Sequence, residues 1–464
     1  MIEIVPIDTP SLGDRSYVAH DGQVALVVDP QRDIDRVLAV TEAAGVRVTH
    51  VFETHIHNDY VTGGLALAQA TGAAYHVNAD DPVAFDRVPV RDGDEVAVGD
   101  RMRVRVIATP GHTFTHLSYA LSDGDEAVGV FTGGSLLFGT TGRPDLLGPD
   151  HTHDLARHQY ASAHRLAGEL PDAARVLPTH GFGSFCSATQ ASADRSTIGL
   201  EKAENPVLTR GEEEWVADLL EGLDVWPAYY AHMGPANSAG PGAPDLSSPE
   251  PADAATLRRR IEAGEWVAAV LDDDREAGEW VVDLRNRVAF AAGHVPGTFN
   301  AGLDGQFATY LGWLIPWGTP LTLLGNTADE VAEAQRELVR IGIDRLEGAA
   351  TGAPQEWTDG ELASYPRATF ADLRDVRHHR EVVILDTRRR LEWEESHIDG
   401  AVHIPLHDLL KREADWPAGE LWVHCAGGYR ASIASSMLAA AGRTVVHVDD
   451  QFSNAQGAGL PVVS

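Results

Sequence analysis

The chain has 464 residues, more than one hydrophobic core of roughly 250–300 residues can hold, so we expect several domains. Its content of 44% apolar and 23% charged residues is typical of a globular protein, and 36 Lys and Arg against 69 Asp and Glu give a formal net charge of −33. This negative charge excludes nucleic acid as an expected partner and disfavours an anionic membrane surface.

The sequence contains no stretch of about 18 consecutive apolar residues, so we expect no membrane-spanning helix. The first residues lack the basic start and apolar run of a signal peptide. Two cysteines, Cys186 and Cys425, are too few for a disulfide framework in a chain of this size. We therefore expect a cytoplasmic protein with two free thiols, and we also expect a homo-oligomer.

Residues 1–235 alternate short apolar strands with helical stretches, which predicts an α/β domain. The apolar runs and helical periodicity predict, in chain order, a strand at 24–30, a helix at 35–45, strands at 46–55, 101–111, 116–121 and 127–134, a helix at 152–170 and a strand at 174–181. Histidines recur where these strands end, a usual place for functional side chains on a rigid scaffold.

Residues 236–252 are rich in Pro, Gly and Ser and predict a linker. Beyond it the sequence repeats, with one copy at 253–352 and a second at 366–464. In each copy an Asp precedes a His by eleven positions: Asp283 and His294 in the first copy, and Asp386 and His397 in the second. The repeat predicts two α/β units of the same kind.

The strongest chemical signal is His55-Ile-His57-Asn-Asp59, directly after an apolar strand. In an extended segment residues i and i+2 point the same way, so His55 and His57 can bind one metal while Asp59 stays close enough to support them. His112 and His180 lie at two further strand ends. Three such fragments in one domain predict a metal site.

The motifs HxHxD at 55–59, TPGHT at 109–113, FTG at 131–133, GRPD at 142–145 and PTHG at 178–181 resemble the metallo-β-lactamase fold. Within that fold the chain is most similar to persulfide dioxygenases, including bacterial fusions to rhodanese domains. The resemblance implies an α/β protein: an N-terminal αββα sandwich with its metal site at one edge of the two sheets, followed by two rhodanese-like domains with central parallel sheets.

The resemblance also implies a metal site that departs from the family pattern. Persulfide dioxygenases hold one iron with two His and one Asp; the two His fall on His55 and His112, but Gly134 stands where the Asp belongs. Tyr60 replaces a further His, so a two-metal hydrolase is disfavoured. His55, His57 and His112 remain as the expected ligands of one Fe(II), with Zn(II) as an alternative and an empty site left open. Replacing Gly134 by Asp is a test of this site, since a large gain in iron affinity would show that the lost carboxylate limits metal binding.

Five other residues are expected to support this site or its substrate, and three of them have an alternative. Tyr60 either hydrogen-bonds a metal-bound ligand or fills the space of a His. Arg143 either faces the carboxylate of a thiol carrier or pairs with Asp145. Cys186 either handles sulfur or is an inert buried thiol. The remaining two, Asp59 and His180, are expected to surround the metal ligands.

A second signal is Cys425-Ala-Gly-Gly-Tyr-Arg430, between an apolar strand and a helix at 431–442. Backbone N–H groups and a helix N-terminus directed at the sulfur stabilise a thiolate, and Gly427 and Gly428 permit the backbone angles that such a loop needs. Arg430 adds positive charge. The Cys-x4-Arg spacing resembles the rhodanese active loop, which implies sulfur transfer through a persulfide on Cys425.

The first copy of the repeat lacks this chemistry. Gly325 stands in the position of the cysteine, and Asp329 and Glu330 replace the Tyr and Arg. We therefore expect a structural or docking domain at 253–352.

These signals together predict a sulfur-metabolism enzyme. The N-terminal domain would oxidise a low-molecular-weight thiol persulfide to sulfite with one ferrous iron, and Cys425 would transfer sulfur between persulfide, sulfite and thiosulfate. Two alternatives remain open: a sulfurtransferase with a metal-poor N-terminal scaffold, and a mononuclear zinc thioester hydrolase.

Overall fold

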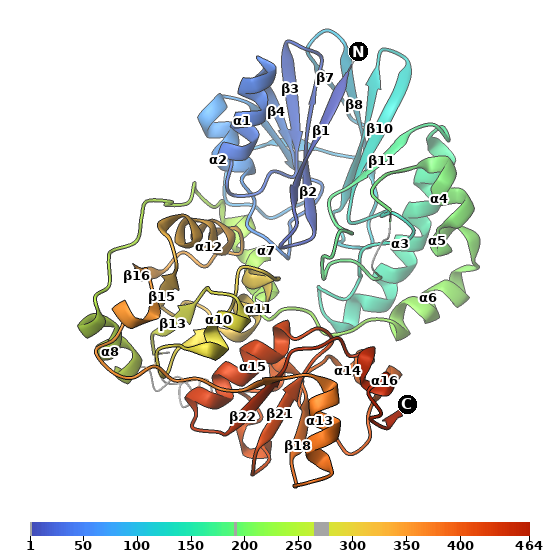
Figure 1. Ribbon diagram of the computed structural model, residues 1–464. Coiled ribbons are helices and arrows are strands. Elements are labelled where there is room, and N and C mark those ends of the chain that lie inside the picture. The colour runs from blue at the N-terminus through green and yellow to red at the C-terminus, as the bar shows by residue number, and fades with distance from the viewer. Residues whose placement is uncertain (1, 190–192, 264–277) are drawn as a thin grey trace. The chain divides into compact units, whose positions relative to one another are not determined.

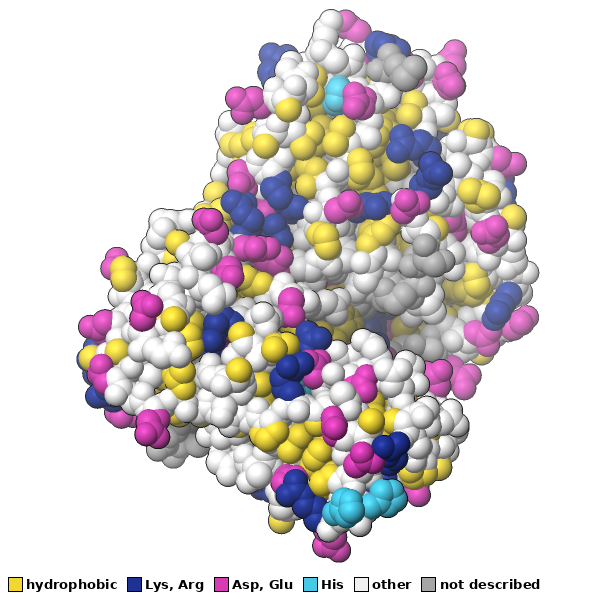
Figure 2. All heavy atoms as spheres, in the orientation of Figure 1, with side chains coloured by type: hydrophobic (Ala, Val, Ile, Leu, Met, Phe, Trp, Pro, Cys, Tyr) yellow, Lys and Arg dark blue, Asp and Glu magenta, His cyan; other side chains and the backbone are white. Residues whose placement is uncertain are grey.

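A computed structural model describes residues 2–189, 193–263 and 278–464, and it contains two compact units (Figure 1). Unit 1 comprises Met1–Asp245 with Val339–Gly342, and unit 2 comprises Leu246–Leu338 with Ile343–Ser464. Within the described ranges, no helix combines the length and the apolar character that crossing a bilayer requires. On the face drawn in Figure 2, acidic side chains are spread over the surface and do not gather in one patch.

Unit 1 is built on two six-stranded sheets. The first has the order β1-β2-β3-β4-β5-β6 and the second β12-β11-β10-β9-β8-β7. The strands of the first sheet are β1 Glu3–Thr9, β2 Asp14–His20, β3 Val24–Val28, β4 Arg47–Phe52, β5 Ala74–Asn78 and β6 Val88–Val90. Those of the second are β7 Glu95–Val98, β8 Met102–Ala108, β9 Leu117–Asp123, β10 Glu126–Gly133, β11 Arg175–Pro178 and β12 Ser196–Thr197.

Alternation along the strands produces the four layers. In β3, Leu26 and Val28 point to the space between the sheets, where they share a core with Phe131 of β10. Ala25 and Val27 point the other way and pack with helices α1 and α2. The outer face of the second sheet packs against α3 and α6. The helix–sheet–sheet–helix order confirms the predicted αββα class.

The helices of unit 1 cover the outer faces of the two sheets. Their bounds are α1 Asp35–Ala44, α2 Gly64–Thr71, α3 Pro149–Glu169, α4 Ile198–Glu204, α5 Pro206–Thr209, α6 Glu212–Glu221 and α7 Tyr230–Ala239. Helix α7 differs from the prediction, because residues 236–239 were expected to begin a linker. Asn237 explains the difference: its buried amide bonds the backbone of the loop after β4, so this segment is part of unit 1.

Unit 2 contains two parallel sheets, of order β14-β13-β15-β16 and β17-β22-β21-β18-β20, and an antiparallel pair β19-β23. The elements of the first copy are α8 Ala254–Ala263, β13 Trp280–Asp283, α10 Arg287–Ala292, β14 Phe299–Asn300, α11 Phe307–Leu314, β15 Leu321–Gly325, α12 Ala328–Arg340 and β16 Leu346–Thr351. Those of the second are β17 Arg367–Ala368, α13 Phe370–Arg377, β18 Val383–Asp386, α14 Arg390–Glu395, β19 His397–Ile398, β20 Val402–His403, β21 Leu421–His424, α15 Tyr429–Ala440, β22 Val445–Val448, α16 Asn454–Gly457 and β23 Val462–Val463. Short 3₁₀ turns lie at Pro354–Glu356, Leu406–Asp408 and Glu413–Asp415.

The two copies repeat in three dimensions as they do in sequence. Arg285 donates to both carboxylate oxygens of Asp283, and Arg388 does the same to Asp386, each with a shortest distance of 2.6 Å. The two parallel sheets confirm the predicted fold class of the C-terminal half. The finer domain boundaries, 1–235, 253–352 and 366–464, stay a prediction.

Candidate functional site

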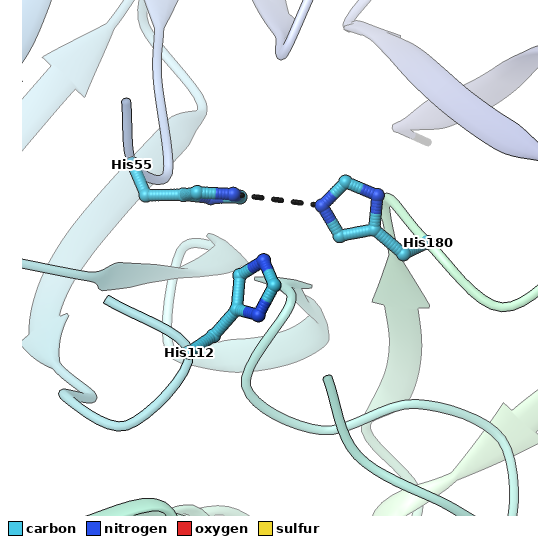
Figure 3. A group of neighbouring side chains, drawn as sticks. All are labelled: His55, His112 and His180. Atoms are coloured by element: carbon cyan, nitrogen blue, oxygen red, sulfur yellow. Dashed lines mark hydrogen bonds between the residues drawn. The ribbon is translucent and has the colours of Figure 1, made fainter. Parts of the chain in front are cut away.

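Three histidines from separate loops meet in unit 1. His55 follows β4, His112 follows β8 and His180 follows β11, and all three side chains are buried. Figure 3 shows their imidazoles turned toward one another. One donor nitrogen of each ring lies within 4.8 Å of those of the other two, and the Nε2 atoms of His55 and His180 are 3.5 Å apart.

A contact at Nδ1 fixes the orientation of each imidazole ring. In every case Nδ1 contacts a protein oxygen, which leaves Nε2 for the shared space. His55 uses Thr54 Oγ1 (2.9 Å), His112 uses the Arg143 carbonyl (2.8 Å), and His180 uses Asp14 Oδ1 (2.9 Å) and Asp59 Oδ2 (3.0 Å). Such outer hydrogen bonds are how proteins set the tautomer of metal-binding histidines.

These residues fit a metal ion. Two nitrogens bound about 2.0–2.1 Å from one tetrahedral ion are about 3.4 Å apart, close to the His55–His180 separation. Within the described residues, His112 Nε2 is buried without a hydrogen-bond partner, as are His57 Nδ1 and Asp59 Oδ1. Burial lowers the pKa of His112 to about 3 and that of His55 well below its usual value, so both rings are neutral at physiological pH, as metal ligands must be.

His180 is the most strongly polarised of the three. Burial alone would lower its pKa, but the carboxylates of Asp59 and Asp14 outweigh burial and raise the pKa to about 10. Burial and the neighbouring Asp59 carboxylate raise the pKa of Asp14 to about 7, while His180 holds the pKa of Asp59 below its usual range although burial opposes this. With no metal bound, His180 therefore carries a positive charge that keeps Asp59 ionised, and it would have to release the proton on Nε2 to bind a metal.

His57 faces two ways. Its Nε2 contacts Glu53 Oε2 at 3.1 Å, the Tyr60 hydroxyl at 3.0 Å and Asp29 Oδ1 at 3.3 Å. Burial opposes a charge on His57, but Asp29 and Glu53 raise its pKa to about 9. His57 also forms one potential ligand group with Asp59 and His180, and another with Asp29 and Glu53. The structure thus divides the predicted trio of His55, His57 and His112 between two groups that share His180.

Gly134 is the point where the chain departs most from the resemblance. A Cβ atom added at Gly134 would lie 2.3 Å from Cδ2 of His112, and one at Gly142 would lie 2.8 Å from Nδ1 of the same ring. The His112 imidazole thus fills the space that a carboxylate at position 134 would need. A Gly134→Asp variant, the test of whether the missing carboxylate limits iron binding, would therefore require the His112 ring to move.

Arg143 and Cys186 occupy structural positions. Arg143 is buried and donates to both oxygens of Asp145, at 2.6 and 2.7 Å, and to the carbonyls of Phe185 and Asp224. This geometry corresponds to the Asp145 pairing, one of the two alternatives for Arg143. Burial and the Asp59 carboxylate raise the pKa of the Cys186 thiol, which keeps it protonated and weakly nucleophilic.

Sequence reasoning missed several residues that hold the site. His116 accepts a hydrogen bond from the Gly134 N–H at 3.0 Å and stacks against His55. Asp29 accepts from the backbone and hydroxyl of Thr54, and it has a positive φ of 50°. Both lie near strand ends, but the sequence gives no sign that their partners come from other strands.

In unit 2, Cys425 lies where β21 meets α15. Its thiol is 2% exposed, and the Gly428 N–H donates to Sγ at 3.1 Å. Gly428 has φ +91°, and a Cβ there would lie 2.3 Å from Asp449 Oδ1, so only glycine fits this turn. The loop therefore directs backbone N–H toward the sulfur, as the sequence predicted.

Arg430 makes its shortest contacts away from the thiol. Its two terminal nitrogens donate to the two oxygens of Glu392 at 2.6 and 2.7 Å. Burial opposes ionisation of Glu392, but Arg430 lowers its pKa to about 2. Arg430 thus fastens the start of α15 to α14, and its charge still lies near Cys425.

In the corresponding loop of the first copy, a glutamate side chain accepts hydrogen bonds from the loop itself. Glu330, at the position equivalent to Arg430, accepts from the Asn326 N–H at 2.7 Å and from the Asn326 amide. With Gly325 in place of cysteine, this loop presents a carboxylate where the second copy presents a thiol.

Comparison with known proteins identifies both parts of the chain. Residues 369–457 match the model of the rhodanese-like domain family. A hydroxyacylglutathione hydrolase of Albidiferax ferrireducens is 32% identical over 182 residues, covering 39% of this chain and 67% of that protein. The chain belongs to the metallo-β-lactamase-fold family and carries a rhodanese-like domain.

Two further comparisons agree with this assignment. Human mitochondrial persulfide dioxygenase ETHE1 is 29% identical over 206 residues, covering 44% of this chain and 72% of that protein. A crystal structure of a metallo-β-lactamase from Staphylococcus aureus has a TM-score of 0.65 and 26% identity, covering 75% of this chain and 99% of that one. The predicted resemblance to a metallo-β-lactamase–rhodanese fusion is confirmed.

In this metallo-β-lactamase-fold unit, Gly134→Asp is expected to reduce bound metal because the new side chain displaces His112. Overpacking of this kind typically costs about 1–3 kcal/mol, so the free energy of unfolding should fall by a similar amount. Metal content after iron reconstitution and urea unfolding measure the two effects. Gly168→Asp, at an exposed position of α3 where a Cβ meets nothing within 4 Å, is the control. A Gly134→Asp protein that holds more iron than the parent would contradict this account.

In the rhodanese-like domain, Glu392→Gln should lower the free energy of unfolding by about 2 kcal/mol at neutral pH, because hydrogen bonds to charged groups contribute about 1.5–3 kcal/mol. The lowered pKa of Glu392 gives a stabilisation that is complete above the unfolded pKa of 4.5 and disappears as the pH falls toward about 2. Urea unfolding between neutral and acidic pH should show the difference shrinking below about pH 4.5. Glu394→Gln is the control, since Glu394 pairs with Arg390 at the surface. A difference that does not change with pH would argue against the ion pair.

Proposed function

We propose that this chain is a sulfur-metabolism enzyme with two sites: a metal centre that oxidises a low-molecular-weight thiol persulfide to sulfite, and Cys425, which transfers sulfane sulfur. The observation that carries the proposal is the pairing of a buried imidazole cluster suited to one metal with a cysteine at the end of a parallel strand that accepts a backbone N–H bond. A persulfide dioxygenase and a rhodanese-like domain among the similar proteins support it.

At the metal centre, His55 and His112 would hold one ferrous ion, with His180 as the third imidazole. The sequence placed His57 in that third position, and His57 stays the alternative because its Nδ1 has no partner within the described residues. A bound ferrous ion supplies the redox chemistry by which dioxygen oxidises sulfur, whereas zinc would polarise a carbonyl. Asp59 would accept hydrogen bonds near the substrate as a carboxylate, and Tyr60 would keep its hydroxyl proton although that hydroxyl already contacts His57.

At Cys425 the chemistry is a sulfur exchange. The thiolate attacks the outer sulfur of a donor such as thiosulfate, the bond between the two donor sulfurs breaks, and sulfite leaves with the electron pair. Cys425 then carries the sulfur as a persulfide anion, which the Gly428 N–H is placed to stabilise. Transfer to a second nucleophile restores the thiolate. Arg430 would position the loop through Glu392 and contribute positive charge.

Both reactions handle persulfide, sulfite or thiosulfate, so joining them in one chain raises the effective concentration of the shared sulfur species. We place the enzyme in the cytoplasm, where a reducing environment keeps Cys425 available as a free thiol.

The hydroxyacylglutathione hydrolases supply the competing proposal. They are as similar to this chain as the dioxygenases are, and a three-imidazole site is a usual arrangement for catalytic zinc. In that case the N-terminal part would cleave a thioester, while Cys425 would act alone on sulfur. A sulfurtransferase whose N-terminal part binds no metal is the remaining alternative.

Two variants separate the sites. Cys425→Ser should abolish thiocyanate formation from thiosulfate and cyanide while bound metal stays unchanged, because the nucleophile is lost but unit 1 is not altered. His180→Ala should leave thiocyanate formation unchanged and reduce bound metal by more than tenfold, since His180 belongs to two of the three potential ligand groups among the described residues. His158→Ala, on the exposed face of α3, controls for loss of a histidine.

The same metal analysis of His57→Ala distinguishes the two ligand sets. We expect His57→Ala to retain most of the metal. Thiocyanate formation that survives in Cys425→Ser would refute the sulfur-transfer proposal, and full metal content in His180→Ala would refute the proposed ligands.

A further inference from the structure

A buried histidine lies against the Cys425 loop. His447 is the third residue of β22, a strand whose four side chains are all buried, and none of the histidine's surface is exposed. The neighbouring strands β17 and β21 pair with its backbone on either side. Burying an imidazole is costly unless its nitrogens find partners, so the contacts of this ring indicate why a polar side chain lies there.

The ring has a partner in the loop itself. Nε2 of His447 lies 2.9 Å from the carbonyl oxygen of Gly428, while Nδ1 makes no hydrogen bond to any residue that the structure describes. Burial lowers the pKa of His447 to about 4, although the Gly428 carbonyl and Asp449 oppose this, so the ring is neutral and carries one proton. Because a carbonyl can only accept, that proton lies on Nε2.

The Gly428 carbonyl accepts from two donors at once. Besides His447, the Ser432 N–H of α15 donates to it at 2.9 Å, and the N–H of the same glycine donates to Cys425 Sγ. Gly428 has φ +91°, and a glycine keeps such a conformation only if contacts outside the residue restrain it. Holding the carbonyl of Gly428 therefore also holds the direction of its N–H.

Asp449 restrains the same glycine from a second direction. It follows His447 by two positions, and side chains two residues apart on an extended segment point to the same side. Its Oδ1 lies beside the Gly428 Cα, and its carboxylate pairs with Arg287 at 2.7 Å and Arg367 at 2.6 Å. Asp449 thus limits the movement of the Cα atom, whereas His447 sets the direction of the carbonyl.

We propose that His447 is a positioning residue for sulfur transfer: through the Gly428 carbonyl it keeps the Gly428 N–H directed at the sulfur of Cys425. The proposal rests on the sulfur transfer proposed for Cys425. In that step the thiolate bonds to the outer sulfur of thiosulfate, the bond between the two donor sulfurs breaks, and sulfite leaves with the electron pair. The negative charge of the thiolate thereby moves to the newly bound sulfur. A donor that is already oriented stabilises this charge without rearranging first.

The position of the proton on Nε2 provides the test, which uses the full-length protein. His447→Leu keeps the volume and removes the donor, and it should lower kcat/KM for thiosulfate about tenfold, as expected for losing one well-placed hydrogen bond. Gln places its amide nitrogen near the position of Nε2, so His447→Gln should stay within about threefold of the unaltered protein. Asn places its amide near Nδ1, so His447→Asn should resemble His447→Leu. Thiocyanate formation from thiosulfate and cyanide measures these rates.

Two controls separate positioning from packing. Val448→Ala removes apolar contacts from the same buried strand, and it should lower Tm but leave kcat/KM within about twofold. His379→Leu, at an exposed position after α13, controls for loss of a histidine. Thermal unfolding should give His447→Leu and His447→Gln Tm values within a few degrees of each other, so that their difference in rate does not come from folding.

Mass spectrometry of Cys425 after mixing with thiosulfate follows the gain of sulfur directly. Equal rates in the unaltered, Leu and Gln proteins would overturn the proposal, and so would an Asn variant as fast as the Gln variant. A loss in Val448→Ala as large as that in His447→Leu would overturn it as well, because packing alone would then explain the effect. If the unaltered protein gains no sulfur, the sulfur transfer proposed for Cys425 is absent, and the positioning role is refuted with it.

Discussion

The hydrogen-bonded placement of His180 between Asp14 and Asp59 is the interaction on which the metal centre depends. Three ionisable groups are buried here, and buried charges persist only when they are paired. Sharing one Nδ1–H between the two carboxylates fixes the imidazole so that Nε2 faces His55. Without Asp14 or Asp59 the His180 ring would lose its orientation. Its Nε2 would then no longer lie beside the rings of His55 and His112.

A steric constraint acts beside this electrostatic one. His112 is packed between two positions that must be glycine, and its Nδ1 is tied to the backbone carbonyl of Arg143. The ring therefore occupies space that a side chain at position 134 would need. The close fit of the His112 ring therefore depends on a glycine, with no carboxylate, at position 134. Three neutral imidazoles carry one negative charge less than a site of two His and one Asp. Ligand charge and type affect whether a site prefers iron or zinc.

The sequence predicted the layers, the parallel sheets and the Cys425 loop because each rests on local signals: alternation along strands, a repeat, and glycines beside a cysteine. The prediction of His55 and His112 as ligands rests on the same kind of local signal. The sequence could not show which groups surround the Nε2 of His57, because they include Asp29, which follows another strand. Nor could it foresee Asn237, whose polar, Pro- and Gly-rich surroundings are typical of a linker although its amide is buried against the loop after β4.

The cysteine-free first copy lies beside the Cys425 loop, which comparing the two sequences does not reveal. Aligning Gly325 with Cys425 makes the first copy look inert, and its own loop is closed by Glu330. Its helix α11 nevertheless lines a pocket beside the other copy's thiol.

In the proposed function, a metal site without a carboxylate at position 134 oxidises sulfur in a chain that also transfers it. Oxygen uptake by the iron-reconstituted protein, supplied with a small-thiol persulfide, tests this proposal. We expect uptake in proportion to the persulfide added, with sulfite as product. No oxygen uptake from a protein that holds iron and still forms a persulfide on Cys425 would contradict it.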